Sequence, residues 1–307
     1  KLQNFFGVFL QFQIGVDSLG NPSVQLLSLA SNANHVTNNL SEMFLEKCIR
    51  CSDCVALVLN KTLLSTEEFE DTRNLLRQMR IETIIDFGRY GFTGVSIETM
   101  CLIVYPKMKP RETSVYSMKF NRKSVREQSY LTDKRFPYFI IYRDEDFDAV
   151  ADKLIFNVFS VFRDRQITKS ITSSERVGPS LWVIKAKNID DDGQGITHIP
   201  GYDVYLPEEI AVTLSAYQYV DDSSVYLTPN MTYNPRVIEN LPGIIPDGSV
   251  AVLIPKKPLR LTKRQRAYFS TEEYRRFYGI ARNLSTQSIN VDKTSVFFYG
   301  VLKENDK

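Results

Sequence analysis

An aromatic side chain on a glycine-rich segment is the first feature of this chain that could do chemistry. Segment 88–94 contains Gly88, Gly91 and Gly94, and Phe92 lies between the last two. Glycine adopts backbone angles that are closed to other residues, so such a loop can present a ring to a ligand. The alternative is that Phe92 caps the edge of a sheet, and the sequence leaves both interpretations open.

A run of cations near the C-terminus could bind phosphate groups. Aromatic residues, Tyr268 and Tyr274 among them, are interleaved with these cations. Clustered Lys and Arg neutralise phosphates and release counterions, whereas a solvated helix face is the alternative. The formal net charge is only +2, so the argument for a polyanionic partner is local. The cations are Lys256, Lys257, Arg260, Lys263, Arg264, Arg266, Arg275, Arg276 and Arg282.

The loop over residues 228–236 carries groups that suit base recognition. Asn230, Asn234 and Arg236 provide amide and guanidinium groups, which pair with base edges in DNA grooves. A surface loop punctuated by proline is the alternative. Neither His35 nor His198 has a nucleophile at a motif spacing, so we predict no catalytic residue for acid–base chemistry.

Three cysteines, Cys48, Cys51 and Cys54, have the C-x-x-C-x-x-C spacing of some iron–sulfur ligand runs. We place Cys48 and Cys51 on the apolar face of a helix that begins at Ser41, where cysteine is a common small core residue. No Cys-Pro pair or further nearby cysteine completes a ligand set, so we predict no metal site.

The composition is that of an ordinary soluble protein. Hydrophobic residues make up 43% and charged residues 24% of 307 residues, which is enough for two domains. No segment approaches the ~20 apolar residues of a membrane span, and no signal peptide is present. We therefore expect a cytoplasmic protein, and the initial Lys1 suggests a fragment of a longer chain.

The glycine loop is expected to join two strands, Ile81–Phe87 and Ile97–Tyr105, which should run antiparallel. Before them, Val55–Leu59 is a buried strand, and a helix with a Ser65–Glu68 capping box should follow it. A strand–helix–strand unit of this kind predicts a parallel crossover. Near the N-terminus, residues 5–29 suggest a hairpin.

The remainder divides into a connector and a second domain. We expect a basic bridge at 107–134, a strand at 136–142, a helix at 145–164 and a linker at 168–176. The second domain should begin near Gly178. Its expected elements are strands at 181–184, 225–228, 250–254 and 296–302, a helix start at 207–209, and a helix with a Ser270–Glu273 capping box.

The order of several motifs resembles the N6-adenine DNA methyltransferases of type II restriction–modification systems. The resemblance covers about Asn39 to the C-terminus. It rests on Phe44–Ile49, Val55–Leu64, Leu75–Arg77, Ile84–Phe87 and Gly91–Val104, followed by Val225–Arg236 and Pro246–Ile254.

The resemblance implies an α/β fold: a partial Rossmann-like methyltransferase sheet ending in an antiparallel hairpin, then a mixed α+β target-recognition domain. Residues 1–110 would be the C-terminal part of the catalytic domain, 111–177 a helical connector, and 178–307 the DNA target-recognition domain. The cofactor would be S-adenosyl-L-methionine. The partners would be double-stranded DNA and a cognate restriction endonuclease, fused or separate. The target adenine would be flipped out of the duplex and stacked on Phe92.

Two family motifs are missing: the glycine-rich cofactor loop and the Asn-Pro-Pro-aromatic tetrapeptide. Gly20–Ser23 is only a turn, because it lacks the second proline and the aromatic. We expect both motifs upstream of Lys1, so the chain would be inactive alone. The alternative is a non-catalytic DNA-binding specificity module that works with a separate catalytic chain.

Overall fold

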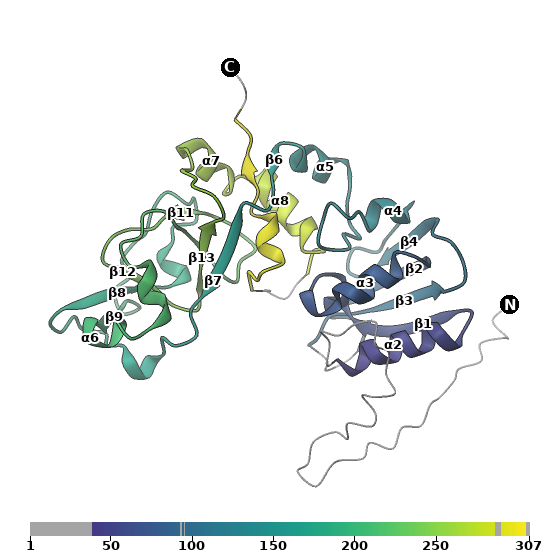
Figure 1. Cartoon of the computed structure of the whole chain (residues 1–307), viewed down its shortest axis with the longest axis horizontal. Coiled ribbons are helices and arrows are strands. Elements are labelled where there is room, and N and C mark those ends of the chain that lie inside the picture. Colours follow the sequence, from purple (N-terminus) through teal and green to yellow (C-terminus); the bar gives the residue numbers. More distant parts are fainter. Residues whose placement is uncertain (1–38, 93, 95, 286–289, 305–307) are drawn as a thin grey trace, which may run out of the picture.

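The computed structural model describes residues 39–92, 94, 96–285 and 290–304. Figure 1 shows two lobes, with the strands β1 to β4 in one and β8 to β13 in the other, and with α5 and α8 between them. The expected hairpin at 5–29 and His35 lie outside the described residues. None of the described helices is long and apolar enough to cross a membrane.

The first lobe is built on a five-stranded sheet with the order β1-β3-β2-β4-β5. Strand β3 pairs antiparallel with both β1 and β2, while β2 and β4 are parallel. The expected antiparallel pair is therefore confirmed. Strands β1 and β2 run in the same direction, as predicted, but β3 lies between them. The strands are β1 (Val55–Asn60), β2 (Arg80–Gly88), β3 (Thr99–Tyr105), β4 (Glu112–Ser117) and β5 (Arg122–Glu127).

Helices α2 (Leu40–Cys51) and α3 (Glu70–Leu76) belong to this lobe. Two short 3₁₀ helices, η1 (Lys61–Leu64) and η2 (Glu67–Phe69), lie between β1 and α3. The predicted Ser65–Glu68 capping box is wrong, because Ser65 ends η1 and Thr66 precedes η2 without a side-chain cap. The placement of Cys51 on a buried face is also wrong: α2 buries Leu45 and Ile49, and Cys51 is exposed.

Residues 107–134 are not a bridge. They form β4 and β5, which extend the first sheet, and α4 (Gln128–Leu131). The expected helical content of the connector 111–177 is therefore wrong. The predicted strand at 136–142 is also absent, because its backbone N–H groups bond to scattered partners instead of a ladder. Phe139 donates to the carbonyl of Leu64, and Ile140 donates to that of Leu131.

The predicted helix at 145–164 ends early. Helix α5 covers Glu145–Ala151, and it is followed by β6 (Leu154–Ile155) and β7 (Phe159–Arg163). Asn157 has a positive φ of 60°, which is incompatible with a continuing helix. Strand β7 then pairs with β13 of the second lobe, and its residue Phe159 is buried in the core there.

The second lobe contains sheets of order β11-β10-β13-β7 and β12-β8-β9. The predicted strands at 181–184, 225–228 and 250–254 are confirmed within one residue. The strands are β8 (Ser180–Ile184), β9 (Val204–Pro207), β10 (Tyr226–Pro229), β11 (Ile238–Glu239), β12 (Ile244–Pro246) and β13 (Val250–Pro255). The short helices are η3 (Lys169–Ile171), η4 (Ala186–Asn188), α6 (Glu208–Ala211) and η5 (Ser215–Tyr219).

The C-terminal part holds α7 (Lys263–Tyr268), α8 (Glu272–Ala281), η6 (Ser295–Phe298) and β14 (Val301–Leu302). Helix α8 buries Tyr274, Phe277 and Ile280, as the sequence pattern predicts. Its N-cap is Thr271, not Ser270, because the Thr271 hydroxyl accepts from the Tyr274 N–H. The predicted strand at 296–302 is wrong except for its last two residues. The whole is a mixed α/β protein with several sheets.

Candidate functional site

The carboxyl ends of β1, β2 and β4 lie at one edge of the first sheet, since these three strands run in the same direction. Ligands of open α/β sheets bind outside this edge. Lys61 follows β1 here, Asp86 lies near the end of β2, and Ser117 ends β4. This edge is therefore where a site should be sought.

A buried ionic network occupies the edge. The Lys61 ammonium donates to Asp86 Oδ2 at 2.7 Å, and the two side chains are 6% and 5% exposed. The Tyr142 hydroxyl donates to the same oxygen at 2.5 Å. Burial, followed by the Asp86 charge, raises the pKa of Tyr142 far above its usual range. Asp86 Oδ1 accepts the Gly88 N–H at 2.9 Å, so the network fixes the start of the glycine loop.

The glycine loop requires its glycines. Gly88 and Gly94 have φ values of +54° and +77°, and a Cβ on Gly91 would lie 2.8 Å from that of Phe87. Phe92 is 47% exposed, and its ring meets Phe87 edge-on with centroids 6.3 Å apart. An exposed ring on a glycine-flexed loop is thus present, and its contact with a ligand stays a prediction.

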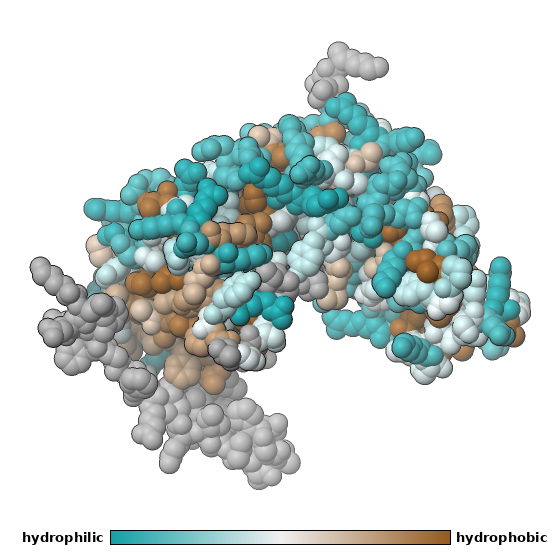
Figure 2. Space-filling model, turned by 180° about the vertical axis from the view of Figure 1, so that it is seen from behind, coloured by the Kyte–Doolittle hydropathy of each residue, from teal (hydrophilic) through white to brown (hydrophobic). Residues whose placement is uncertain are grey.

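The far end of this loop touches the second half of the chain. Ser285, which follows α8, donates a hydrogen bond to the Glu98 carboxylate. Tyr233 lies close enough that, after burial, the Glu98 charge raises its pKa, while Arg282 and Arg89 oppose this. Seen from behind in Figure 2, the surface is hollowed between the two lobes.

A pocket of about 210 Å³ joins the lobes, and we call it the cleft pocket. Within it, the Arg282 guanidinium lies 5.7 Å from the centre of the Tyr278 ring and donates to the carbonyl of Asn290 at 3.2 Å. The Arg282 cation and the Tyr278 ring therefore lie on the same wall of the cleft pocket. The lining residues are Lys119, Phe120, Thr232, Tyr233, Tyr278, Gly279, Arg282, Leu284 and Ser285. Phe92 is not among them.

The structure divides the predicted cations into two groups. Arg276 and Arg282 on the α8 segment line pockets that adjoin the first lobe, and Arg275 is exposed on α8. The others surround α7, which Figure 1 places at the upper edge of the molecule. Lys256, Lys257 and Arg260 line a pocket with β6 and β14, Lys263 and Arg266 line one with β11, and Arg264 lines a third. None of these pockets brings Phe92 together with the predicted cations.

The predicted base-reading residues mostly turn inward. The Asn230 amide donates to the carbonyl of Gly248 at 2.9 Å, and Asn230 is buried. The Arg236 guanidinium, also buried, donates to the carbonyl of Ile189 at 3.0 Å, and the Asn234 amide donates to that of Asp191 at 3.2 Å. Burial lowers the pKa of Arg236. These groups hold the loop together, so we assign them no base contacts.

Sequence reasoning missed the residues of the same region that do face outward. Tyr233 is exposed in the loop that carries Asn234, and Phe120 is exposed between β4 and β5. The sequence could have indicated the exposure of both rings. Each is a large aromatic residue flanked by polar residues, in a segment without apolar periodicity.

The described residues do not fit S-adenosyl-L-methionine. No glycine occurs between β1 and Gly88, and β1 runs directly into η1, whose Thr62 N–H is capped by the Asn60 side chain. Asp86, the carboxylate at this edge, is already held by Lys61 and Tyr142. Among the described residues, no group of three or more His, Cys, Asp or Glu side chains could hold a metal ion.

No protein-family model and no curated protein matches the chain. Solved structures similar to it include the Type IIL restriction-modification enzyme MmeI in complex with DNA, with 11% identity and a TM-score of 0.47, covering 79% of this chain and 40% of that one. A nuclease-deletion mutant of the Type ISP restriction-modification enzyme LlaGI with a DNA substrate mimic has 8% identity and a TM-score of 0.45, covering 83% and 35%.

The M protein of the Type I restriction enzyme EcoKI has 18% identity and a TM-score of 0.23, covering 26% of this chain and 19% of that one. The chain thus spans less than half the length of each of these three structures. All three are restriction–modification proteins.

Proposed function

We propose that this chain belongs to a DNA methyltransferase of a restriction–modification system, which transfers a methyl group to the N6 atom of adenine. The described residues would supply its DNA-binding side. The observation that carries the proposal is the exposed Phe92 on a glycine loop at the carboxyl edge of the first sheet, together with the cationic and aromatic cleft pocket between the lobes.

Phe92 would hold an adenine that has left the duplex. Extruding a base costs a few kcal/mol, and stacking on an aromatic ring returns about 1–3 kcal/mol. A ring can repay this cost only if its loop is held in place before the base arrives. Here Asp86 fixes the Gly88 end and Ser285 fixes the Glu98 end of that loop.

The cleft pocket would contact the DNA backbone. Lys119 of the first lobe and Arg282 at the end of α8 both line it, so a strand that crosses the pocket could meet a cation from each segment. Exposed Tyr233 adds a ring for stacking. Such an interface predicts affinity that falls steeply as salt rises.

S-adenosyl-L-methionine would supply the methyl group when bound. Because the described residues do not fit it, we derive no step of the transfer from them. The same misfit favours a second candidate: a non-catalytic specificity module that brings DNA to a separate catalytic chain. Both candidates require duplex DNA to contact the residues that line the cleft pocket.

The first test is binding and base extrusion. Repeated selection from a random duplex pool should yield a preferred site, in which each adenine is then replaced by the fluorescent base 2-aminopurine. We expect one position to brighten on binding, and Phe92→Ala should alter that signal while Tyr90→Ala, an exposed ring on the same loop, should not. Absence of duplex binding, or an unchanged signal in Phe92→Ala, contradicts the proposal.

The second test separates the two candidates. The selected duplex is incubated with radiolabelled S-adenosyl-L-methionine and the product of the whole reading frame that contains this chain, and incorporation of label at adenine is measured. Incorporation identifies a methyltransferase. Site-specific binding without incorporation identifies the specificity module.

A further inference from the structure

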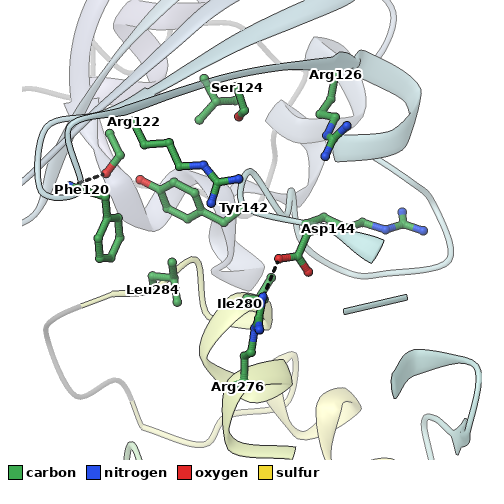
Figure 3. Close-up of a pocket in the computed structure, with 12 residues that line it drawn as sticks. Phe120, Arg122, Ser124, Arg126, Tyr142, Asp144, Arg276, Ile280 and Leu284 are labelled. Atoms are coloured by element: carbon green, nitrogen blue, oxygen red, sulfur yellow. Dashed lines mark hydrogen bonds and ion pairs between the residues drawn. The ribbon is translucent and has the colours of Figure 1, made fainter. Parts of the chain in front are cut away.

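Arginines from three segments converge on a pocket of about 290 Å³ between β5 and α8. Figure 3 shows Arg122 reaching toward Tyr142 and Arg126 pointing down from the same strand, with Arg276 rising from α8 on the opposite side. Arg143 also lines this pocket, which we call the arginine pocket. Only Arg276 was expected from the sequence to bind a partner.

The pattern along β5 explains the convergence. Side chains of a strand alternate between its faces, so Arg122, Ser124 and Arg126 share one face, and all three line the arginine pocket. Lys123 and Val125 lie on the other face. On the neighbouring strand β4, Ser117 pairs in register with Arg122, and Ser117 also lines the arginine pocket. The arrangement is therefore a property of the sheet edge and does not depend on one rotamer.

The pairing of these arginines leaves positive charge available. No acidic side chain of the described residues lies within 4 Å of the Arg122 guanidinium. Arg126 is 3.7 Å from Glu145, which is 89% exposed, and Arg276 is 2.6 Å from the exposed Asp146. Exposed ion pairs contribute only about 0–1 kcal/mol, so an incoming anion can displace them.

The remaining charges of the arginine pocket are engaged by the protein. Arg143 is buried and held by Asp133 at 2.9 Å and Asp148 at 2.7 Å, so its role is structural. Among the described residues, Asp144 is the one carboxylate that lines the pocket. Its Oδ1 accepts the Phe147 N–H at 2.9 Å, and its Oδ2 lies 3.3 Å from Arg276.

The arginine pocket continues into the cleft pocket. Phe120 and Leu284 line both. A guanidinium group binds two oxygens of a phosphate at once through two parallel N–H donors. A carboxylate ligand could accept the same hydrogen bonds, but it carries less negative charge than a phosphate group can. A chain of phosphates that crosses the cleft pocket would reach Arg122 and Arg126 next.

We propose that the arginine pocket binds a backbone phosphate of the same duplex DNA, with Arg122, Arg126 and Arg276 as its contacts. The β4–β5 hairpin is then a DNA-binding element of the first lobe. This inference rests on the proposed function. The simplest alternative is that the charges of β5 only protect the edge of the sheet from pairing with other strands.

The test compares the two faces of β5. Binding of fluorescein-labelled mixed-sequence duplex is measured by anisotropy over a KCl series, with the wild type, Arg122→Gln/Arg126→Gln and the matched control Lys123→Gln. The double variant should raise Kd about tenfold or more and reduce the salt slope by about 1, because one neutralised phosphate contributes ~0.9. Lys123→Gln should stay within about twofold of wild type. If the double variant does not fold, the single variant Arg122→Gln is used in its place, because Arg122 is exposed.

The outcomes are distinct. If the wild type binds no duplex, the proposed function fails and the inference fails with it. If the wild type binds but the double variant matches either wild type or Lys123→Gln, the arginine pocket is not a contact, while the proposed function stands. A third arm measures Tm with inorganic phosphate alone. If phosphate stabilises the wild type but not the double variant, and duplex affinity is equal, the pocket takes a free phosphate ligand and the backbone assignment is wrong.

Discussion

Asp86→Asn is expected to destabilise the protein strongly, because it breaks a buried ion pair without removing bulk. Tyr142 donates to Oδ2 and Gly88 to Oδ1 of Asp86, and asparagine keeps only one oxygen, so the change removes the charge and one of these two hydrogen bonds. Breaking one side of a buried pair typically costs 3–5 kcal/mol. Glu98 lies 4.0 Å from the Lys61 ammonium and offsets part of this, so we expect about 3 kcal/mol.

The assay is urea unfolding, followed by circular dichroism, of Asp86→Asn and of the matched change Asp53→Asn. Asp53 pairs with Lys107 at 2.5 Å, but these side chains are 80% and 76% exposed. The exposed change should therefore alter the free energy of unfolding by less than about 0.5 kcal/mol. Equal effects of the two changes, or an Asp86→Asn effect below about 1 kcal/mol, would refute the reasoning.

The double variant Lys61→Met/Asp86→Leu checks the cause. If the penalty of Asp86→Asn comes from an unpaired buried ammonium, removing both charges should cost less than removing one. A double variant that is less stable than Asp86→Asn would instead assign the effect to packing around Tyr142.

Three further predictions concern other parts of the molecule. Burial raises the pKa of Asp203, but hydrogen bonds from a neighbouring amide, an imidazole and a backbone N–H outweigh it and lower the pKa below 3.8. The stability that Asp203 contributes should therefore be present above pH 3.8 and be lost as the pH falls through the lower pKa of the folded state. In urea unfolding, the stabilities of the wild type and Asp203→Asn should converge at that low pH. Cys51 and Cys54 should react rapidly with a thiol reagent in the folded protein while the two half-buried cysteines react slowly, and metal analysis should find no stoichiometric iron or zinc. Lys257→Gln/Arg264→Gln should leave duplex affinity within about twofold of wild type, because both cations lie on the α7 side; a tenfold loss in anisotropy would move the interface to that side.

The elements that the sequence predicts well are those whose pattern is imposed by burial. Strands β2 and β3 bury alternate residues, and their predicted bounds are within two residues of those observed. Strand β5 has no such pattern, because it is an edge strand with its residues exposed or half-buried on both faces. Its Arg-Lys-Ser-Val-Arg-Glu sequence therefore resembles a basic loop, and the hairpin is missed.

The site is harder to predict than the strands, because residue type does not show which way a polar group points. Asn230 and Arg236 have the groups that read bases, yet both are buried and bond to carbonyl groups of their own lobe. Arg122 has the same chemistry as Arg236 but lines a pocket, and no acidic side chain in the described part of the chain lies within 4 Å of its guanidinium. Only packing distinguishes these cases.

The contacts that shape the site also join residues far apart in the chain. Lys61, Asp86 and Tyr142 meet at one oxygen, and Glu98 bonds to Ser285 across 187 positions. Such a contact ties the Phe92 loop to the end of α8, which also carries Arg282. A duplex that moves α8 when it binds must therefore also move the end of the loop that holds the proposed stacking ring. If the two are coupled in this way, Ser285→Ala should weaken the base-extrusion signal more than it weakens duplex binding. Equal losses in both would mean that the hydrogen bond only stabilises the fold.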